Sequence, residues 1–111
     1  AFSSLLPLFT HLIARLSQKR IEYERNKQQF LALISEIQDD AKPVGYEAKR
    51  EEIIRILNEI AALSQTISIK YLSLAADTEN PYAEQNLIKS ASEYAAKSLE
   101  AEAEAKRFAS K

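Results

Sequence analysis

The scarcity of helix-breaking residues is the sequence feature that most constrains this fold. The 111 residues contain one glycine and three prolines, whereas a β-sandwich or β-barrel needs turn signals about every 8 to 12 residues. Breakers and polar turn residues gather at two places, DDAKPVG at residues 39–45 and DTENP at residues 77–81. The chain therefore divides into three long segments without strong breakers, which predicts an all-α fold.

Local capping signals set the expected ends of the helices. Ser4 is a suitable N-cap, because Pro7 then occupies the third helical position, where a backbone N–H has no partner to lose. Asn80 followed by Pro81 is a favoured start for the last helix. The predicted helices span residues 4–40, 46–76 and 81–110. At 1.5 Å per residue they are about 55, 45 and 45 Å long, and these similar lengths predict one antiparallel up-down-up bundle covering residues 1–111.

Apolar residues recur every seven positions, as is typical of helices that pack side by side. The first heptad row comprises Phe2, Phe9, Leu16, Tyr23, Phe30 and Ile37, and the second comprises Tyr46, Ile53, Ile60, Ile67 and Leu74. The middle helix carries a second apolar stripe of Ile54, Ala61, Ile69, Leu72 and Ala76. Two stripes predict that the middle helix lies between the other two. The third helix contributes Leu87, Ile88, Ala91, Tyr94, Ala95, Leu99 and Phe108 to a thinner core.

Residues 17–29 interrupt the pattern, since Ile21 and Tyr23 are their only large apolar side chains. Antiparallel pairing places this polar stretch opposite the apolar residues 57–69. Three explanations stay open: the third helix covers residues 57–69, another chain covers them, or the polar stretch lines a partly polar cavity. A second chain would make the protein a dimer that completes a larger bundle.

The residue inventory argues against catalysis. The chain has no cysteine and a single histidine, and His11 has no acidic residue three positions before it, as a di-iron helical bundle requires. Neighbouring carboxylates such as Glu51 and Glu52 diverge by about 100° around a helix and do not converge on a shared site. No nucleophile motif or phosphate-binding glycine loop is present. We therefore expect a non-enzymatic protein with no catalytic residues, no cofactor and no metal.

Charge and hydropathy bear on the partners. The net charge is −1, although five basic residues stand against two acidic ones in the first 35 residues, so nucleic-acid binding by the monomer is not expected. The apolar opening segment is interrupted by Pro7, His11 and Arg15 and falls short of the roughly 18 apolar residues of a transmembrane helix. The chain starts at Ala1 and contains no methionine, so we expect it to be processed or part of a longer protein. The compartment stays open.

These observations favour a protein–protein interaction or assembly module that binds a protein partner or itself. The candidate interface residues are Phe2, Leu5, Leu6, Phe9, Ile13, Ile54, Ile69 and Leu72. One alternative is a ligand-sensing or carrier bundle with a small-molecule cavity lined by the tyrosines, which are spread over all three helices. Another is a coat or nucleic-acid-organising subunit that acts as an oligomer.

Overall fold

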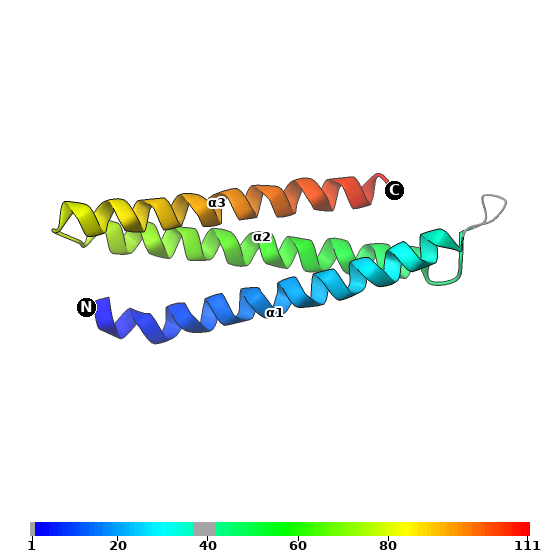
Figure 1. Cartoon of the computed structure of the whole chain (residues 1–111), viewed down its shortest axis with the longest axis horizontal. Coiled ribbons are helices and arrows are strands. Elements are labelled where there is room, and N and C mark those ends of the chain that lie inside the picture. The colour runs from blue at the N-terminus through cyan, green and yellow to red at the C-terminus, as the bar shows by residue number, and fades with distance from the viewer. Residues whose placement is uncertain (1, 37–41) are drawn as a thin grey trace.

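The chain forms an antiparallel bundle of three helices. The computed structural model describes the backbone of residues 2–36 and 42–111, and the side chains of residues 9–36 and 42–111. Helices α1 (Phe2–Ser35), α2 (Tyr46–Ala76) and α3 (Pro81–Ala109) follow one another with no strand among the described residues. They run up, down and up along a rod of 63 × 22 × 15 Å (Figure 1). The predicted all-α three-helix bundle is confirmed.

The predicted bounds hold for α2 and, within one residue, for α3, but they are wrong for α1. The first helix begins at Phe2, so Ser4 lies inside it and is not its N-cap. It ends at Ser35 and not at residue 40, because the chain tightens there into a turn in which the Glu36 amide donates to the Leu33 carbonyl at 3.1 Å. Residues 37–41, with Ile37 of the first heptad row, lie outside the described residues.

Two residues define the starts of the other helices. Gly45 precedes α2 with φ at 88°, a left-handed conformation that glycine adopts without a Cβ penalty. At α3, the side chain of Asn80 accepts hydrogen bonds from the amides of Tyr82 at 2.9 Å and Ala83 at 3.3 Å. Pro81 occupies the first turn. The predicted Asn80 cap is confirmed.

Helix α2 lies between its neighbours, as predicted. It packs against both α1 and α3 along the rod (Figure 1). Helices α1 and α3 meet through the rings of Tyr23 and Phe30 on α1 and Phe108 on α3. All five residues of the heptad row of α2 are buried, as are Phe9, Leu16 and Phe30 of the first row. Tyr23 of the first row is half-buried against this core. Phe2 is outside the residues whose side chains are described.

The second apolar stripe of α2 does not form the contact with α3, and that part of the prediction is wrong. Of this stripe only Ala61 is buried, while Ile69, Leu72 and Ala76 are exposed. The α2–α3 contact is instead built from small residues, because the Ser98 hydroxyl donates to the Ala61 carbonyl at 2.9 Å and the Ser68 hydroxyl to the Ala91 carbonyl at 2.7 Å. Small side chains allow this close approach of two helix backbones.

Aromatic clusters join all three helices near both ends of the rod. At one end, the Phe30 ring lies 5.0 Å from that of Tyr46 and 5.5 Å from that of Phe108, measured between ring centroids. At the other end, Phe9 meets Tyr71 edge-on at 4.4 Å, and Tyr71 stacks on Tyr94 at 5.7 Å. Edge-to-face and offset contacts of this kind stabilise aromatic pairs beyond their buried area.

Candidate protein-interaction surface

Four of the five exposed large apolar residues of α2 and α3, all but Tyr82, lie on the face of the two helices that is turned away from α1. On α2, Glu59 contacts α1 and Ala61 contacts α3. At 100° per residue, Ile54 and Leu72 lie about 20° from Ala61 and Ile69 about 80° from it, on the solvent side between these two contacts. On α3, Phe108 lies beside Tyr23 of α1, and Leu99 falls on the opposite side. We call this surface the outer face, and it comprises Ile54, Ile69, Leu72, Ile88, Ala95 and Leu99.

Much of this apolar surface is open to solvent. The exposed fractions are 54% for Ile69, 48% for Leu72, 41% for Ile88 and 66% for Leu99. Helix α2 carries no charged residue between Glu59 and Lys70, and Glu59 is turned toward Lys19 of α1. On α2 the middle of the outer face is therefore uncharged, and Gln65 is the polar residue exposed there.

The structure separates the predicted interface residues into three groups. Ile54, Ile69 and Leu72 lie on the outer face, Ile54 half-buried and the other two exposed. Phe9 is buried in the core, and Ile13 is half-buried against it. Phe2, Leu5 and Leu6 fall outside the residues whose side chains are described.

Sequence reasoning placed Ile88, Ala95 and Leu99 in the core, whereas the structure leaves them exposed. The sequence feature that predicts their exposure is the row of alanine and serine residues on the neighbouring side of α3. Helix α3 buries Ala91, Ser98, Ala101 and Ala105 together with Phe108. A helix that buries this small-residue row cannot also bury Leu99, which lies about 100° from Ser98.

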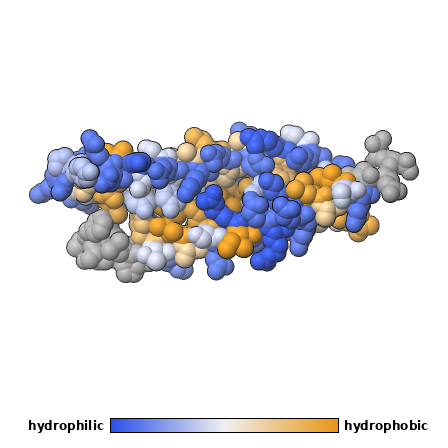
Figure 2. Space-filling model, viewed as in Figure 1, coloured by the Kyte–Doolittle hydropathy of each residue, from blue (hydrophilic) through white to orange (hydrophobic). Residues whose placement is uncertain are grey.

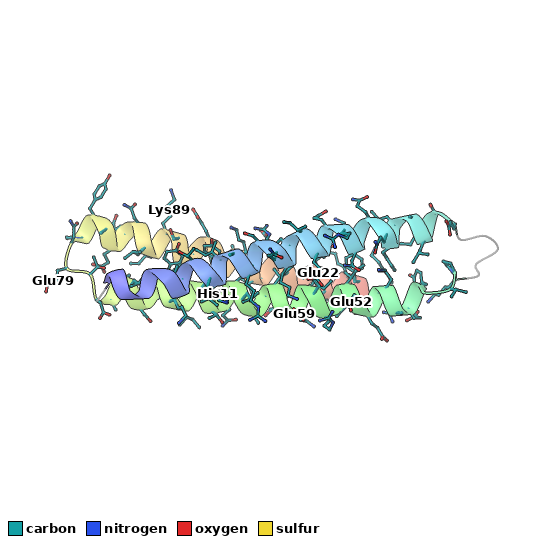
Figure 3. All side chains as sticks on the ribbon, turned by 90° about the horizontal axis from the view of Figure 1, so that it is seen from below. His11, Glu22, Glu52, Glu59, Glu79 and Lys89 are labelled. Atoms are coloured by element: carbon teal, nitrogen blue, oxygen red, sulfur yellow. The ribbon has the colours of Figure 1, made fainter. Side chains whose placement is uncertain are left out.

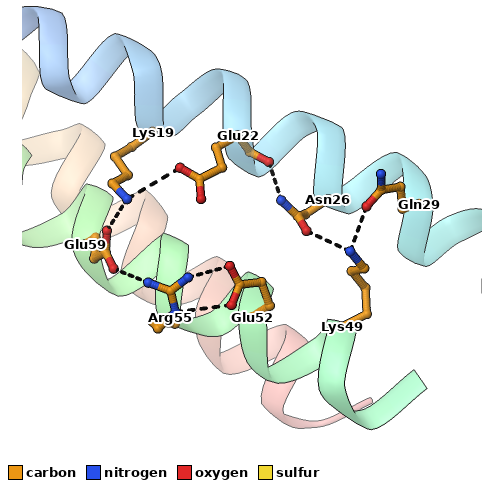
Figure 4. Close-up of polar contacts among 8 residues, drawn as sticks. All are labelled: Lys19, Glu22, Asn26, Gln29, Lys49, Glu52, Arg55 and Glu59. Carbon is orange, nitrogen blue, oxygen red and sulfur yellow. Dashed lines mark hydrogen bonds and ion pairs between the residues drawn. The ribbon is translucent and has the colours of Figure 1, made fainter. Parts of the chain in front are cut away.

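Polar contacts along the α1–α2 contact account for the polar stretch of residues 17–29 (Figure 4). The Lys19 ammonium lies 2.7 Å from the Glu59 carboxylate, which also pairs with Arg55 at 2.7 Å. The Lys49 ammonium donates to the side-chain oxygens of Asn26 at 3.0 Å and Gln29 at 2.7 Å. One flank of the polar stretch thus meets polar positions on α2, while α3 covers Ala61 and its neighbours.

These contacts also set the protonation of the pair. The hydrogen bond from Lys19 holds the pKa of Glu59 below its usual value, against the opposing effect of partial burial. The same bond raises the pKa of Lys19.

Glu22 and Glu59 lie where α1 and α2 run side by side near the middle of the rod, and His11 lies nearer the N-terminal end of α1 (Figure 3).

The other flank of the polar stretch lines a groove of about 380 Å³ between the three helices. Its walls carry three basic residues, Arg20, Lys27 and Lys97, and three acidic residues, Glu24, Glu100 and Glu104. Tyr23, Leu57, Ile60, Ser64 and Ala101 also line it. This mixture of charges is not a basic stripe for phosphates. On the face that Figure 2 shows, polar side chains likewise interrupt the apolar surface along the rod.

Two groups in the groove have unusual environments. Burial, reinforced by the nearby carboxylate of Glu104, raises the pKa of Tyr23 to about 12. The Ser64 hydroxyl is fully buried and has no hydrogen-bond partner among the described residues. The other tyrosines do not join Tyr23 here, since Tyr46 and Tyr71 belong to the aromatic clusters near opposite ends.

The described residues contain no group of three His, Cys, Asp or Glu side chains placed to hold a metal ion. None of the three helices, over the part that the structure describes, combines the length and hydropathy that crossing a membrane requires. No protein-family model, no curated protein and no solved structure matches the chain. The functional proposal therefore rests on the exposed residues of the outer face.

Proposed function

We propose that the chain is a non-catalytic protein–protein assembly module that binds its partner through the outer face. The observation that supports this proposal is the exposed, uncharged row formed by Ile69, Leu72, Ile88 and Leu99. Contiguous apolar surface with a polar rim marks interaction sites on proteins. Scattered single apolar residues carry no such meaning, but these four side chains lie on two adjacent helices of one face.

The exposed area indicates the strength of binding. Burying the exposed parts of Ile69, Leu72 and Leu99 contributes about 1–3 kcal/mol each at about 25 cal/mol per Å². Association costs about 4–15 kcal/mol in lost translational and rotational freedom. These three side chains therefore only offset the cost of association. Micromolar affinity needs a surplus of about 8 kcal/mol, which the rest of the interface has to supply, so we expect a complex no tighter than micromolar.

Site-specific photo-crosslinking tests the proposal. A photoreactive phenylalanine analogue replaces Leu99 in one variant and Glu93 in a control variant, and both are expressed in cells where the chain naturally occurs. Glu93 is also exposed on α3 but points away from the outer face. We expect a protein adduct at Leu99 and none at Glu93. Equal adducts at both positions, or no adduct at Leu99, would refute the proposal.

The groove supports a second candidate function, a ligand-sensing bundle. A buried hydroxyl without a partner is costly, and a bound polar group that accepts from Ser64 would remove that cost. A thermal-shift screen with small polar molecules tests this candidate. A ligand that raises the melting temperature of the native chain and loses its effect on Ser64→Ala supports it, whereas a screen without such a ligand argues against it.

A further inference from the structure

We infer that the groove between the three helices binds a small zwitterion with an apolar side chain, the chemistry of an aliphatic or aromatic α-amino acid. The inference rests on the second candidate function, the ligand-sensing bundle, and names its class of ligand. It comes from the order in which hydroxyl, charged and apolar groups follow one another along the groove. With a volume of about 380 Å³, the groove is in the size range of small-molecule sites.

Ser64 defines one end of this order, because its hydroxyl is fully buried, lines the groove and has no partner among the described residues. The two serine hydrogen bonds between α2 and α3 set the register of these helices and make Ala95 level with Ser64. Lys97 follows Ala95 by two residues and Glu100 by five. At 1.5 Å per residue, Lys97 is about 3 Å and Glu100 about 7.5 Å further along the axis. A basic group therefore lies nearest the hydroxyl, and an acidic group follows about one turn beyond it.

Neither of these two charges is neutralised by a neighbour. Among the described residues, Lys97 and Glu100 form no ion pair with each other or with any other side chain. The Lys97 ammonium lies 4.5 Å from the centre of the Tyr94 ring, which places it toward the level of Ser64. Glu93, one turn before Lys97, is exposed and does not line the groove. A carboxylate that accepts from Ser64 would pair with Lys97, and an adjacent ammonium would pair with Glu100.

The wall formed by α1 has the same order of charge. Arg20 precedes Glu24 by four residues, and α1 runs parallel to α3, so the basic residue is again nearer the end with the hydroxyl. The contacts between helices make Arg20 about level with Glu100, and helix side chains tilt toward the N-terminus, which directs Arg20 toward the hydroxyl. Lys27 lies at the far end, and Glu104 already pairs outside the groove. A zwitterion meets an opposite charge at both positions, whereas a lone anion or cation meets groups of its own sign.

The floor of the groove beside these charges is apolar. Leu57, Ile60 and Ala101 line it, and all three are buried. Ile60 precedes Ser64 by one helical turn, on the side of Glu100. An apolar side chain on the ligand therefore packs on α2 while its charged end meets Ser64 and α3.

A nuclear magnetic resonance titration of the full chain with L-phenylalanine tests the inference. We expect saturable shifts of the backbone amides around Ser64, Lys97 and Glu100, with a dissociation constant of about 1 mM for a ligand of this size in an open groove. Phenylpropanoate lacks the ammonium, phenylethylamine lacks the carboxylate, and glycine lacks the apolar side chain. Each of these three probes should bind about fivefold more weakly or worse.

Variants assign the two ends of the ligand. Ser64→Ala should weaken phenylalanine binding about tenfold, because it removes a hydrogen bond to a charged group. Lys97→Gln and Glu100→Gln should each weaken it about fivefold. Glu100→Gln should not weaken phenylpropanoate, and Lys97→Gln should not weaken phenylethylamine. The matched controls Glu102→Gln and Lys106→Gln, which are exposed on the other side of α3, should leave phenylalanine binding unchanged.

The outcomes separate this inference from the ligand-sensing function. Phenylpropanoate or phenylethylamine binding as tightly as phenylalanine overturns the inference, and so does a loss in the control variants equal to that of Lys97→Gln. Absence of saturable shifts at about 20 mM phenylalanine, twentyfold above the expected dissociation constant, also overturns it. If the thermal-shift screen then yields another ligand that depends on Ser64, the ligand-sensing function stands with a different class of ligand. If it yields none, both are wrong. Circular dichroism confirms that each variant is folded before its binding is measured.

Discussion

Three buried serines at the α2–α3 contact allow a matched test of how this contact is stabilised. Ser68 and Ser98 donate hydrogen bonds to carbonyls of the facing helix, whereas Ser64 has no partner among the described residues. Each serine is almost fully buried in the interior of a helix. Replacement by alanine therefore changes the same few atoms in three similar environments, and the hydrogen bond is the principal difference.

The expected magnitudes follow from these contacts. Ser98→Ala removes one hydrogen bond, which stabilises a fold by about 0.5–1.5 kcal/mol net, while the Ala61 carbonyl keeps its intrahelical partner. Ser64→Ala removes an unpartnered hydroxyl that costs about 1–3 kcal/mol. The gain in helix propensity from serine to alanine is common to both variants. Because the two effects are opposite in sign, the free energies of unfolding of the two variants should differ by about 1.5–4.5 kcal/mol, with Ser64→Ala the more stable.

Urea unfolding followed by far-ultraviolet circular dichroism measures this difference. The measurement is made at low micromolar concentration, so that association does not contribute. Equal denaturant slopes ensure that the shift in midpoint reports stability. Ser68→Ala should behave like Ser98→Ala. If Ser64→Ala is as destabilising as Ser98→Ala, the assignment of hydrogen bonds across this contact is wrong.

Two further predictions concern α2. Glu59→Gln should destabilise the fold at neutral pH. Because Lys19 lowers the pKa of Glu59, this stabilisation is present above the unfolded value of about 4.3 and is lost as the pH falls through the folded pKa. Urea unfolding at pH 7 and pH 3 should show a larger gap in stability between the native and variant chains at pH 7 than at pH 3. Gly45→Ala should cost about 1–2 kcal/mol in the same assay, since φ is 88° and the space around Gly45 is open, so strain acts alone; an unchanged midpoint would contradict this.

The sequence predicted the parts of the fold that depend on strong local signals or on large side chains. Gly45 and the Asn80–Pro81 pair mark helix starts unambiguously, and the heptad rows identify the core of α1 and α2. The end of α1 was wrong because no strong breaker precedes Pro43, so apolar periodicity alone extended the helix past Ser35.

The packing of α3 could not be predicted for a different physical reason. The search for apolar periodicity counts large apolar side chains, and for this reason it predicted that Ile88 and Leu99 lie in the core. The observed contact depends on alanine and serine, whose value lies in the close approach they permit and in hydroxyl bonds to the facing backbone. A serine on a helix carries no sequence mark that separates Ser98, which is buried, from Ser92, which is exposed.

The small-residue contact and the apolar outer face are two consequences of one arrangement. A row of alanine and serine brings α2 and α3 close together but buries little apolar area, while larger residues such as Ile69 and Leu99 remain exposed beside it. A bundle that maximised its stability as a monomer would exchange these positions, with leucine in the contact and polar residues outside. Exposed leucine and isoleucine lower solubility and contribute little to the isolated fold. With the small residues inside the contact and the large apolar residues outside it, the bundle becomes more stable when another surface covers the outer face. The crosslinking experiment tests whether such a surface binds there.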